Sequence, residues 1–275
     1  MLKEAVAGIL SEKEITDLYG AFDQIGSIII IRIPDSLVLK KKAIGEILLQ
    51  RVKTAKSVFY QSSPVEGDFR TRNLELLAGE NNTETEYKEY GCMFKVDVQK
   101  AFFSPRLSTE RNRIANLVEE GETVINMFGG IGMFSIMAAK KKKCTVYNID
   151  INPDAAELCM QNIKLNKLKG KVESIRGDAA KIIEVRLSGK GDRILMLLPE
   201  RSDEFIDSAI KASKKNAIIH YYCHIHAEKK NEVAKLAKER FLKIIKVKSE
   251  ILDSKIVRPV GPRFYQAVVD AKISK

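Results

Sequence analysis

From Ser104 onward, short apolar runs alternate with longer segments of helical character. This pattern predicts β-strands separated by α-helices. The first predicted helix covers residues 105–119, with Ser104 as its N-cap and Pro105 as its first residue. The predicted strands are 123–127, 144–149, 171–175, 192–198, 217–222, 243–249 and 264–271, with helices between the first five. Such strands are typical of an α/β Rossmann-like parallel sheet covered on both faces, while the last two predict an antiparallel pair.

The first 95 residues follow a different pattern. Residues 1–20 predict a helix, and the apolar run 26–33 predicts a strand. Residues 87–98 predict a further strand with a turn at Gly91. Between them, residues 40–56 predict a basic amphipathic helix whose apolar side consists of Ile44, Ile47, Leu48 and Val52. We therefore expect a small N-terminal α+β domain in residues 1–95 and a Rossmann-like domain in residues 96–275.

The chain is basic, with 47 Lys and Arg against 36 Asp and Glu and a formal net charge of +11. The excess lies in residues 96–275, while residues 1–95 are close to neutral. A basic surplus favours a polyanionic partner. A lysine-rich solvated surface explains the charge equally well, so charge alone does not decide between these two interpretations.

Three further features limit the choice of function. The four cysteines are widely spaced, which argues against disulfides and structural zinc. His220, His224 and His226 lack a completing cysteine or carboxylate pattern, so we predict no metal. No run of eighteen apolar residues and no apolar signal core occurs, so we predict a cytoplasmic protein without membrane association.

A glycine-rich loop follows the strand at 123–127. Within residues 128–132, Gly129, Gly130 and Gly132 allow a sharp turn and a close approach of a ligand to the next helix. We expect Phe128 and these glycines to contact a cofactor. The G-G-x-G spacing differs from the dinucleotide fingerprint and disfavours a nicotinamide oxidoreductase. A glycine loop by itself is equally consistent with a structural turn.

Polar residues or a turn signal also follow the next three strands. A carboxylate at Asp150 is suited to two ribose hydroxyls, and one at Asp178 to an adenine amino group. Each could instead cap a helix, but their succession favours a nucleoside-bearing cofactor. A reacting base would lie near the fourth strand end. The predicted cofactor contacts after the glycine loop are Asp150, Ile151, Asn152, Asp178, Ala179 and Pro199.

Several of these segments together resemble one enzyme family. The resemblance rests on the segments Phe103–Arg111 (FSPRLSTER), Asn126–Gly132 (NMFGGIG), Asp150–Asp154 (DINPD), Gln161–Lys167 (QNIKLNK) and Ile219–Tyr222 (IHYY). They closely resemble the archaeal and eukaryotic tRNA (guanine-37 N1)-methyltransferases, from about Gly26 to the end. The resemblance implies transfer of a methyl group from S-adenosylmethionine to N1 of the guanine 3′ of the anticodon.

The resemblance also implies a role for three residues and a partner. Glu110 matches the general base that removes the N1 proton. Arg106 matches an arginine beside the methyl donor and the target base. Arg70, in Phe69–Arg72 (FRTR), matches the arginine that stabilises negative charge on guanine O6. The expected partner is the anticodon stem-loop of tRNA, with no obligate protein partner.

The sequence departs from the family at two positions. Leu197 stands where the family often has asparagine, and Phe102 stands where a tyrosine often precedes FSPR. Related wyosine-pathway aminocarboxypropyl transferases usually have a smaller residue in place of Arg106 and lack the Leu-Pro at the end of the fourth strand. Arg106 and Pro199 therefore favour methyl transfer. Three alternatives stay open. One is a wyosine-pathway aminocarboxypropyl transferase acting on the same tRNA position, and another is a wider pocket that also accepts a tricyclic wyosine precursor. The third is a tRNA-binding protein without catalysis, against which the presence of Glu110 and Arg70 argues.

Overall fold

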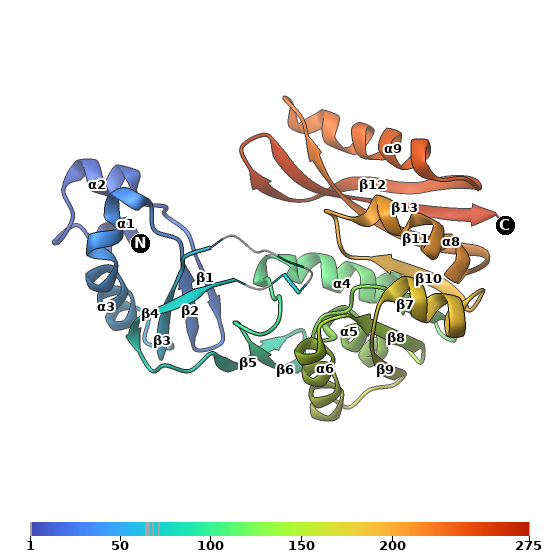
Figure 1. The fold of residues 1–275 in the computed structure, drawn as a ribbon, viewed down its shortest axis with the longest axis horizontal. Helices are drawn as coiled ribbons and strands as arrows, with labels where there is room; N and C mark the ends of the chain where they lie inside the picture. Colours follow the sequence, from blue (N-terminus) through green and yellow to red (C-terminus); the bar gives the residue numbers. More distant parts are fainter. Residues whose placement is uncertain (1, 64–66, 68, 71, 275) are drawn as a thin grey trace. The chain divides into compact units, whose positions relative to one another are not determined.

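The structure is a computed structural model that describes residues 2–63, 67, 69–70 and 72–274. The chain forms two compact units, Met1–Pro105 and Arg106–Lys275 (Figure 1). Compactness does not test independent folding, so the division into domains at residues 1–95 and 96–275 stays a prediction. Within the described ranges, no helix is long and apolar enough to cross a membrane.

The second unit contains a seven-stranded sheet in the order β12-β13-β11-β10-β7-β8-β9. Its strands are β7 (Thr123–Asn126), β8 (Thr145–Asp150), β9 (Lys171–Arg176), β10 (Gly191–Met196), β11 (Ser213–His226), β12 (Lys248–Gly261) and β13 (Phe264–Ser274). Its helices are α4 (Ser108–Leu117), α5 (Met133–Lys141), α6 (Pro153–Leu165), α7 (Ala179–Ile182), α8 (Ile206–Ala212) and α9 (Val233–Ile244). Four short turns accompany them: η2 (Pro105–Leu107), the π-helical η3 (Ile183–Leu187), η4 (Ser202–Phe205) and η5 (Lys230–Glu232).

The strand directions confirm the predicted α/β sheet. Strands β7 to β11 pair in parallel, while β13 pairs antiparallel with both β11 and β12. The order of the strands reverses at β7, which lies between β8 and β10. In open α/β sheets, ligands bind beyond the carboxyl ends of the strands at such a reversal. This position coincides with the glycine loop after β7 and the Leu-Pro segment after β10.

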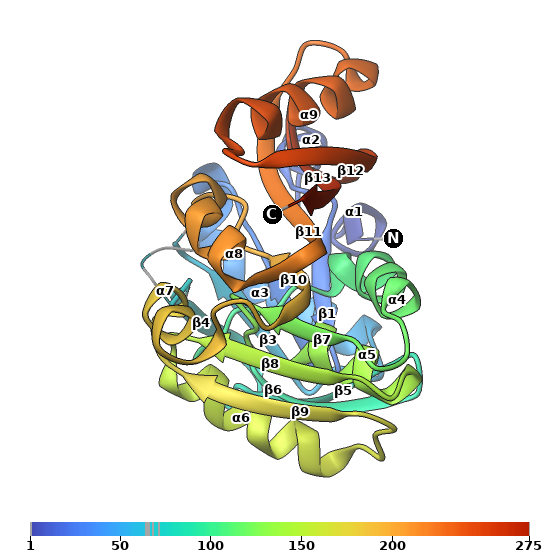
Figure 2. The ribbon, with the colours of Figure 1, turned by 90° about the vertical axis from the view of Figure 1, so that its right-hand side faces the viewer.

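Helices cover both faces of this sheet (Figure 2). Alternating side chains of the strands build an apolar layer on each face. Val124 and Leu195 face a cluster with α4 and α5. Their neighbours Ile125 and Ile194 face the larger cluster with η3, α8 and α9. Burial on both faces explains why consecutive residues of these strands, such as Val124 and Ile125 or Ile194 and Leu195, are apolar.

One predicted element was wrong. The strand predicted at 243–249 is misplaced, because α9 continues to Ile244 and β12 begins only at Lys248. Val233, Ala237 and Phe241 recur at helical spacing and are fully buried against the sheet. This helical period outweighs the short apolar run that had predicted a strand. The antiparallel terminal pair itself is confirmed, and it forms a long hairpin.

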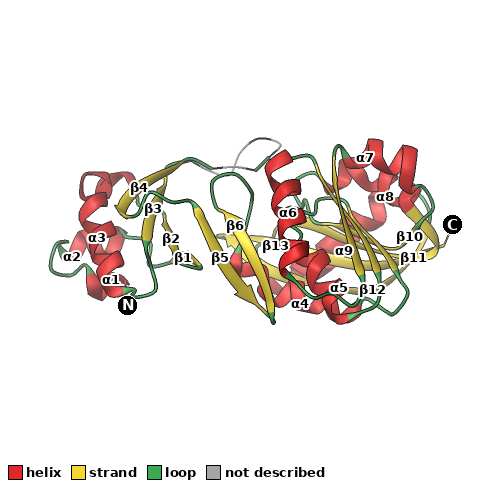
Figure 3. Cartoon of the chain, turned by 90° about the horizontal axis from the view of Figure 1, so that it is seen from below, coloured by secondary structure: helices red, strands yellow, loops and turns green. Residues whose placement is uncertain are grey.

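The first unit is built on a four-stranded sheet in the order β1-β2-β3-β4, with a separate two-stranded β5-β6 pair (Figure 3). Its strands are β1 (Phe22–Ile25), β2 (Ile28–Ile31), β3 (Ser57–Gln61), β4 (Leu74–Gly79), β5 (Glu84–Glu89) and β6 (Cys92–Asp97). Its helices are α1 (Leu2–Ala5), α2 (Glu12–Asp17) and α3 (Lys41–Arg51), with the 3-10 turn η1 (Asp35–Lys40) before α3.

Helix α3 packs closely on the sheet of this unit. Ile44 and Leu48 are buried in a cluster with residues of β2, β3 and β4, as the amphipathic pattern predicted. A Cβ on Gly45 would lie 2.4 Å from Leu77 Cβ, so the approach requires glycine here. Three expectations were too coarse: the helix at 1–20 is two short helices, the strand at 26–33 is part of a hairpin, and residues 87–98 cover parts of β5 and β6.

Candidate active site

The glycine loop connects β7 to α5 in a conformation that its own packing requires. The Gly129 amide donates a hydrogen bond to Ile149 O at 2.7 Å. A Cβ on Gly129 would lie 2.1 Å from Asn148 Oδ1, and one on Gly132, at φ 90°, would lie 2.6 Å from Cys159 Sγ. The structural explanation for these glycines therefore holds whether or not they also admit a ligand.

A cluster of buried polar side chains holds the glycine loop in place through hydrogen bonds. Asn126 Nδ2 donates to Ser135 Oγ at 3.1 Å, and Ser135 Oγ donates to Asn148 Oδ1 at 2.6 Å. Asn148 Nδ2 in turn donates to Gly130 O at 3.3 Å. Within the described part of the chain, buried Asn126 Oδ1 lacks a hydrogen-bond partner. Sequence reasoning missed this cluster, although two asparagines within apolar strands were a detectable signal.

Asp150 lies at the carboxyl end of β8, next to this loop. Its Oδ2 accepts a hydrogen bond from the Gly130 amide at 2.7 Å, and its Oδ1 accepts one from the Asn152 amide at 2.9 Å. Asn152 also caps α6 through the Asp154 amide at 2.9 Å. The structure thus fixes the orientation of the Asp150 carboxylate beside the glycines. Ile151, between these residues, is 44% exposed.

The other predicted cofactor contacts have varied surroundings. Asp178 caps α7 by accepting a hydrogen bond from the Lys181 amide at 3.0 Å, as its alternative role suggested. Phe128 is half-buried, with its ring edge-to-face against Phe205 at 4.9 Å. Ala179 and Pro199 are buried, whereas Arg106 is exposed. Their contacts with a cofactor stay predictions.

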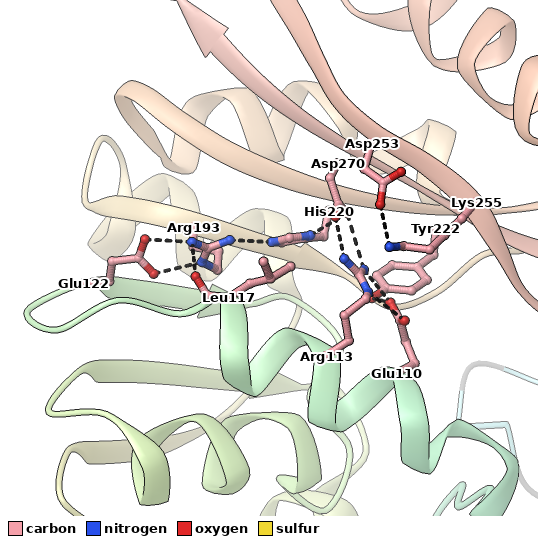
Figure 4. Close-up of polar contacts among 10 residues, drawn as sticks. All are labelled: Glu110, Arg113, Leu117, Glu122, Arg193, His220, Tyr222, Asp253, Lys255 and Asp270. Atoms are coloured by element: carbon pink, nitrogen blue, oxygen red, sulfur yellow. Dashed lines mark hydrogen bonds and ion pairs between the residues drawn. The ribbon is translucent and has the colours of Figure 1, made fainter.

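Glu110, the predicted base, is nearly buried on the first turn of α4 (Figure 4). Its Oε1 accepts hydrogen bonds from Arg113 at 2.6 Å and from the Tyr222 hydroxyl at 2.5 Å. Its Oε2 accepts a hydrogen bond from Arg113 Nε at 2.8 Å. Burial, followed by the nearby Glu110 charge, raises the pKa of Tyr222 well above its usual range, so the hydroxyl keeps its proton.

Beyond Arg113, a line of charged groups continues along the same face of the sheet. Arg113 donates to Asp270 at 2.5 Å, and Asp270 contacts His220 Nδ1 at 2.6 Å. His220 Nε2 lies 2.8 Å from Arg193, which also forms two 2.8 Å hydrogen bonds to Glu122. These residues were not predicted. For Arg193, His220 and Asp270, the signal was a charged or polar residue inside a largely apolar strand, as in GDRILM, IIHYY and VVDA.

Arg70 belongs to the first unit and has a left-handed backbone, with φ 53°. Its guanidinium carbon lies 4.0 Å from the ring centre of Phe102, a cation–π contact. The residue that departs from the family pattern thus places an aromatic face against the predicted charge stabiliser. Thr71, of the FRTR stretch, lies outside the described residues.

The histidines lie in unlike surroundings. His220 is buried between Asp270 and Arg193, while the His224 ring lies 5.0 Å from that of Phe264. Among the residues that the structure describes, no three His, Cys, Asp or Glu side chains form a possible metal site.

Stability is expected to decrease in mild acid because of His220. Burial lowers the pKa of His220, partly opposed by the hydrogen bond to Asp270, so the unfolded chain binds the proton more readily. The free energy of unfolding should fall as the pH drops below about 6.5, by at most about 1.4 kcal/mol per pH unit. Urea denaturation at several pH values would measure this slope. A His220→Asn variant, which cannot titrate there, should have a shallower slope; equal slopes would contradict the assignment.

Comparison with known proteins extends over nearly the whole chain. Residues 85–252 match the TRM5/TYW2 methyltransferase domain, and residues 2–83 match the TYW2 N-terminal domain. The tRNA (guanine(37)-N(1))-methyltransferase Trm5b of Pyrococcus abyssi is 41% identical over 262 residues, covering 92% of this chain and 75% of that protein. The tRNA 4-demethylwyosine(37)-methyltransferase Taw21 of Saccharolobus solfataricus is 36% identical, covering 93% and 95%. A solved complex of aTrm5 and tRNALeu superposes with a TM-score of 0.85 at 37% identity, covering 99% of this chain and 78% of that one.

Proposed function

Because the chain belongs to the TRM5/TYW2 methyltransferase family, we propose that it transfers a methyl group from S-adenosylmethionine to N1 of guanine 37 in tRNA. The family resemblance found in the sequence is thereby confirmed. The single observation that carries the assignment of the reaction is the buried carboxylate of Glu110, because methyl transfer to guanine N1 requires removal of a proton.

The residues at the strand ends fit S-adenosylmethionine. The carboxylate of Asp150 is oriented by two backbone amides and can accept hydrogen bonds from ribose hydroxyls. Gly129 and Gly132 let the loop backbone pack closely on Asn148 and Cys159, which holds the loop in place beside Asp150. Exposed Ile151 offers an apolar surface for the adenine ring. When bound, the cofactor supplies an electrophilic methyl group.

Glu110 is placed to accept the N1 proton through Oε2. A carboxylate oxygen has two lone pairs, and among the described residues Oε2 accepts one hydrogen bond, from Arg113. As the N1–H bond breaks, the proton would move to Oε2, and the N1 lone pair would become available to bond to the methyl carbon that the cofactor supplies. The electrons of the broken sulfur–methyl bond would stay on the cofactor's sulfur, which leaves as a neutral thioether. Negative charge spreads to guanine O6 as the proton leaves, and Arg70 is assigned to stabilise it. Arg106 is assigned to position donor and base.

We assign the anticodon stem-loop as the part of tRNA that the enzyme binds, because guanine 37 lies there. The net charge of +11 favours binding to phosphates. Around α3, Lys42, Arg51, Lys53 and Lys56 are exposed, whereas Lys41 pairs with Glu75 at 2.7 Å. The exposed set therefore supports contact with the stem. We propose a cytoplasmic location for this reaction.

A second substrate is a tricyclic wyosine precursor at the same position. Two observations favour it: Leu197 removes an amide expected beside the target base, and Taw21 matches this chain over 95% of its own length. The Leu197 side chain packs instead against the apolar cluster of α4 and α5. Loss of a base-specific hydrogen bond would relax selection between guanine and its tricyclic derivative.

Nucleoside mass spectrometry tests the proposed reaction. Transfer RNA with an unmodified guanine 37 is incubated with the enzyme and S-adenosylmethionine, then digested. We expect 1-methylguanosine at position 37, and a tRNA with guanosine 37 replaced by adenosine serves as the control. An aminocarboxypropyl product would contradict methyl transfer, and an unchanged nucleoside with intact tRNA binding would favour the non-catalytic alternative.

A further inference from the structure

The Glu110 side chain shares its arginine with a second carboxylate. Arg113 lies between Glu110 and Asp270 and donates hydrogen bonds to both, at 2.6–2.8 Å and 2.5–3.4 Å (Figure 4). Asp270 is in register with His220 across the β11–β13 pair, and its carboxylate contacts that ring. All of these groups are at most one-fifth exposed. The arrangement is a built cluster rather than a chance surface pairing.

This cluster does not carry protons away from Glu110. Arginine has donors only and keeps its proton in proteins, so Arg113 interrupts any relay from Glu110 to Asp270. Arg193 interrupts it again on the other side of His220. Because Arg193 donates to His220 Nε2, the proton of the ring is on Nδ1 and is donated to Asp270. The histidine is therefore neutral, and its role is to orient Asp270.

The balance of charges suggests a different role. Burial alone would raise the pKa of Asp270, but the hydrogen bonds from His220 and Arg113 hold it below its usual range, so Asp270 stays ionised. Arg113 is then balanced by Asp270 even when Glu110 is neutral. Without Asp270, protonation of Glu110 would leave a buried, unpaired arginine, which is costly. Because Arg113 also pairs with Asp270, Glu110 can gain a proton without leaving the Arg113 cation unpaired.

Building on the proposed function, we propose that Asp270 is a positioning residue for methyl transfer. Acting through Arg113, it preserves the ability of Glu110 to accept the N1 proton while fixing the carboxylate in place. Among the described residues drawn in Figure 4, the other groups near Glu110 do not supply this effect. Tyr222 is a neutral donor from β11, and on β12 Asp253 and Lys255 pair with each other.

Two substitutions at this cluster should shift the pH dependence in opposite directions. Asp270→Asn keeps hydrogen-bonding capacity but removes the charge, so Glu110 alone balances Arg113 and binds a proton less readily. The acid limb of the single-turnover rate should move to lower pH by about one unit or more, with at least about a tenfold lower plateau. Arg113→Gln removes the cation and should move the limb to higher pH. Asp270→Glu should restore the limb toward that of the unsubstituted enzyme.

The controls separate this proposal from a purely structural role and from the proposed function. Asp203, in η4, pairs with Arg240 at 2.8 Å and accepts a hydrogen bond from the Tyr221 hydroxyl. Asp203→Asn therefore removes a carboxylate that, like Asp270, contacts an arginine and a side chain of β11. The Asp203→Asn enzyme should have the same acid limb of the single-turnover rate as the unsubstituted enzyme. If the unsubstituted enzyme forms no methylguanosine, the proposed function fails. If that enzyme is active while Asp270→Asn and Arg113→Gln both keep its acid limb, the positioning role of Asp270 is overturned.

Discussion

Glu110→Gln is expected to lower the single-turnover rate of methyl transfer by about 10²–10⁴-fold, the usual contribution of a positioned base. Glutamine preserves the size of the side chain but cannot accept the N1 proton. Because Asp270 still pairs with Arg113, we expect the variant to fold. The rising limb of the pH profile should also disappear.

The alternative is that Glu110 only pairs within its helix and stabilises it. Rapid-quench measurement with saturating enzyme and cofactor gives the rate of the folded protein, and calorimetry gives the affinity for S-adenosylmethionine. Cofactor affinity should be nearly unchanged, and Asp203→Asn should have a normal rate. A Glu110→Gln enzyme with normal melting temperature and normal rate would eliminate Glu110 as the base.

Asp150→Ala should weaken binding of S-adenosylmethionine by about 1.5–3 kcal/mol, the range for hydrogen bonds to a charged group. This corresponds to about a 10- to 150-fold higher Kd. The substitution also removes the acceptor for the Gly130 and Asn152 amides, so part of the loss comes from a less ordered loop. Calorimetric titration of the purified protein measures the Kd.

A nearby substitution provides the matched control. Asp154 is exposed on the first turn of α6, four residues after Asp150, and Asp154→Ala should bind the cofactor normally. Asp150→Asn keeps one acceptor oxygen and should have an intermediate Kd. Unchanged affinity in Asp150→Ala would refute the ribose assignment.

The sequence predicted best those features that depend on local order. The strands that end at Asn126, Asp150 and Arg176 were recognisable because each is short, contains Val and Ile, and is followed by a turn or helix signal. Their chemistry could be read in advance because parallel strands bring their carboxyl ends to one edge. The end of α9 was predicted wrongly, because the apolar run at the end of this helix has the composition of a strand.

The surroundings of Glu110 could not be predicted in the same way. Arg113 is three residues from Glu110, but Asp270 is 157 residues from Arg113 along the chain. Its position depends on the antiparallel return of β13 beside β11, which sets His220 against Asp270. Local patterns identify polar residues in buried strands, whereas only the register shows which of them meet.

The long terminal hairpin also affects how the molecule behaves in solution. Strand β12 is an edge of the seven-stranded sheet, and its pairing with β13 is interrupted by three register shifts. It carries charged residues along its length and a proline at position 259. Irregular pairing, charge and proline all oppose the addition of a strand from another chain. We therefore expect little aggregation through the β12 edge, even in a highly concentrated preparation. A regular, unbroken edge strand would add strands from other chains more readily.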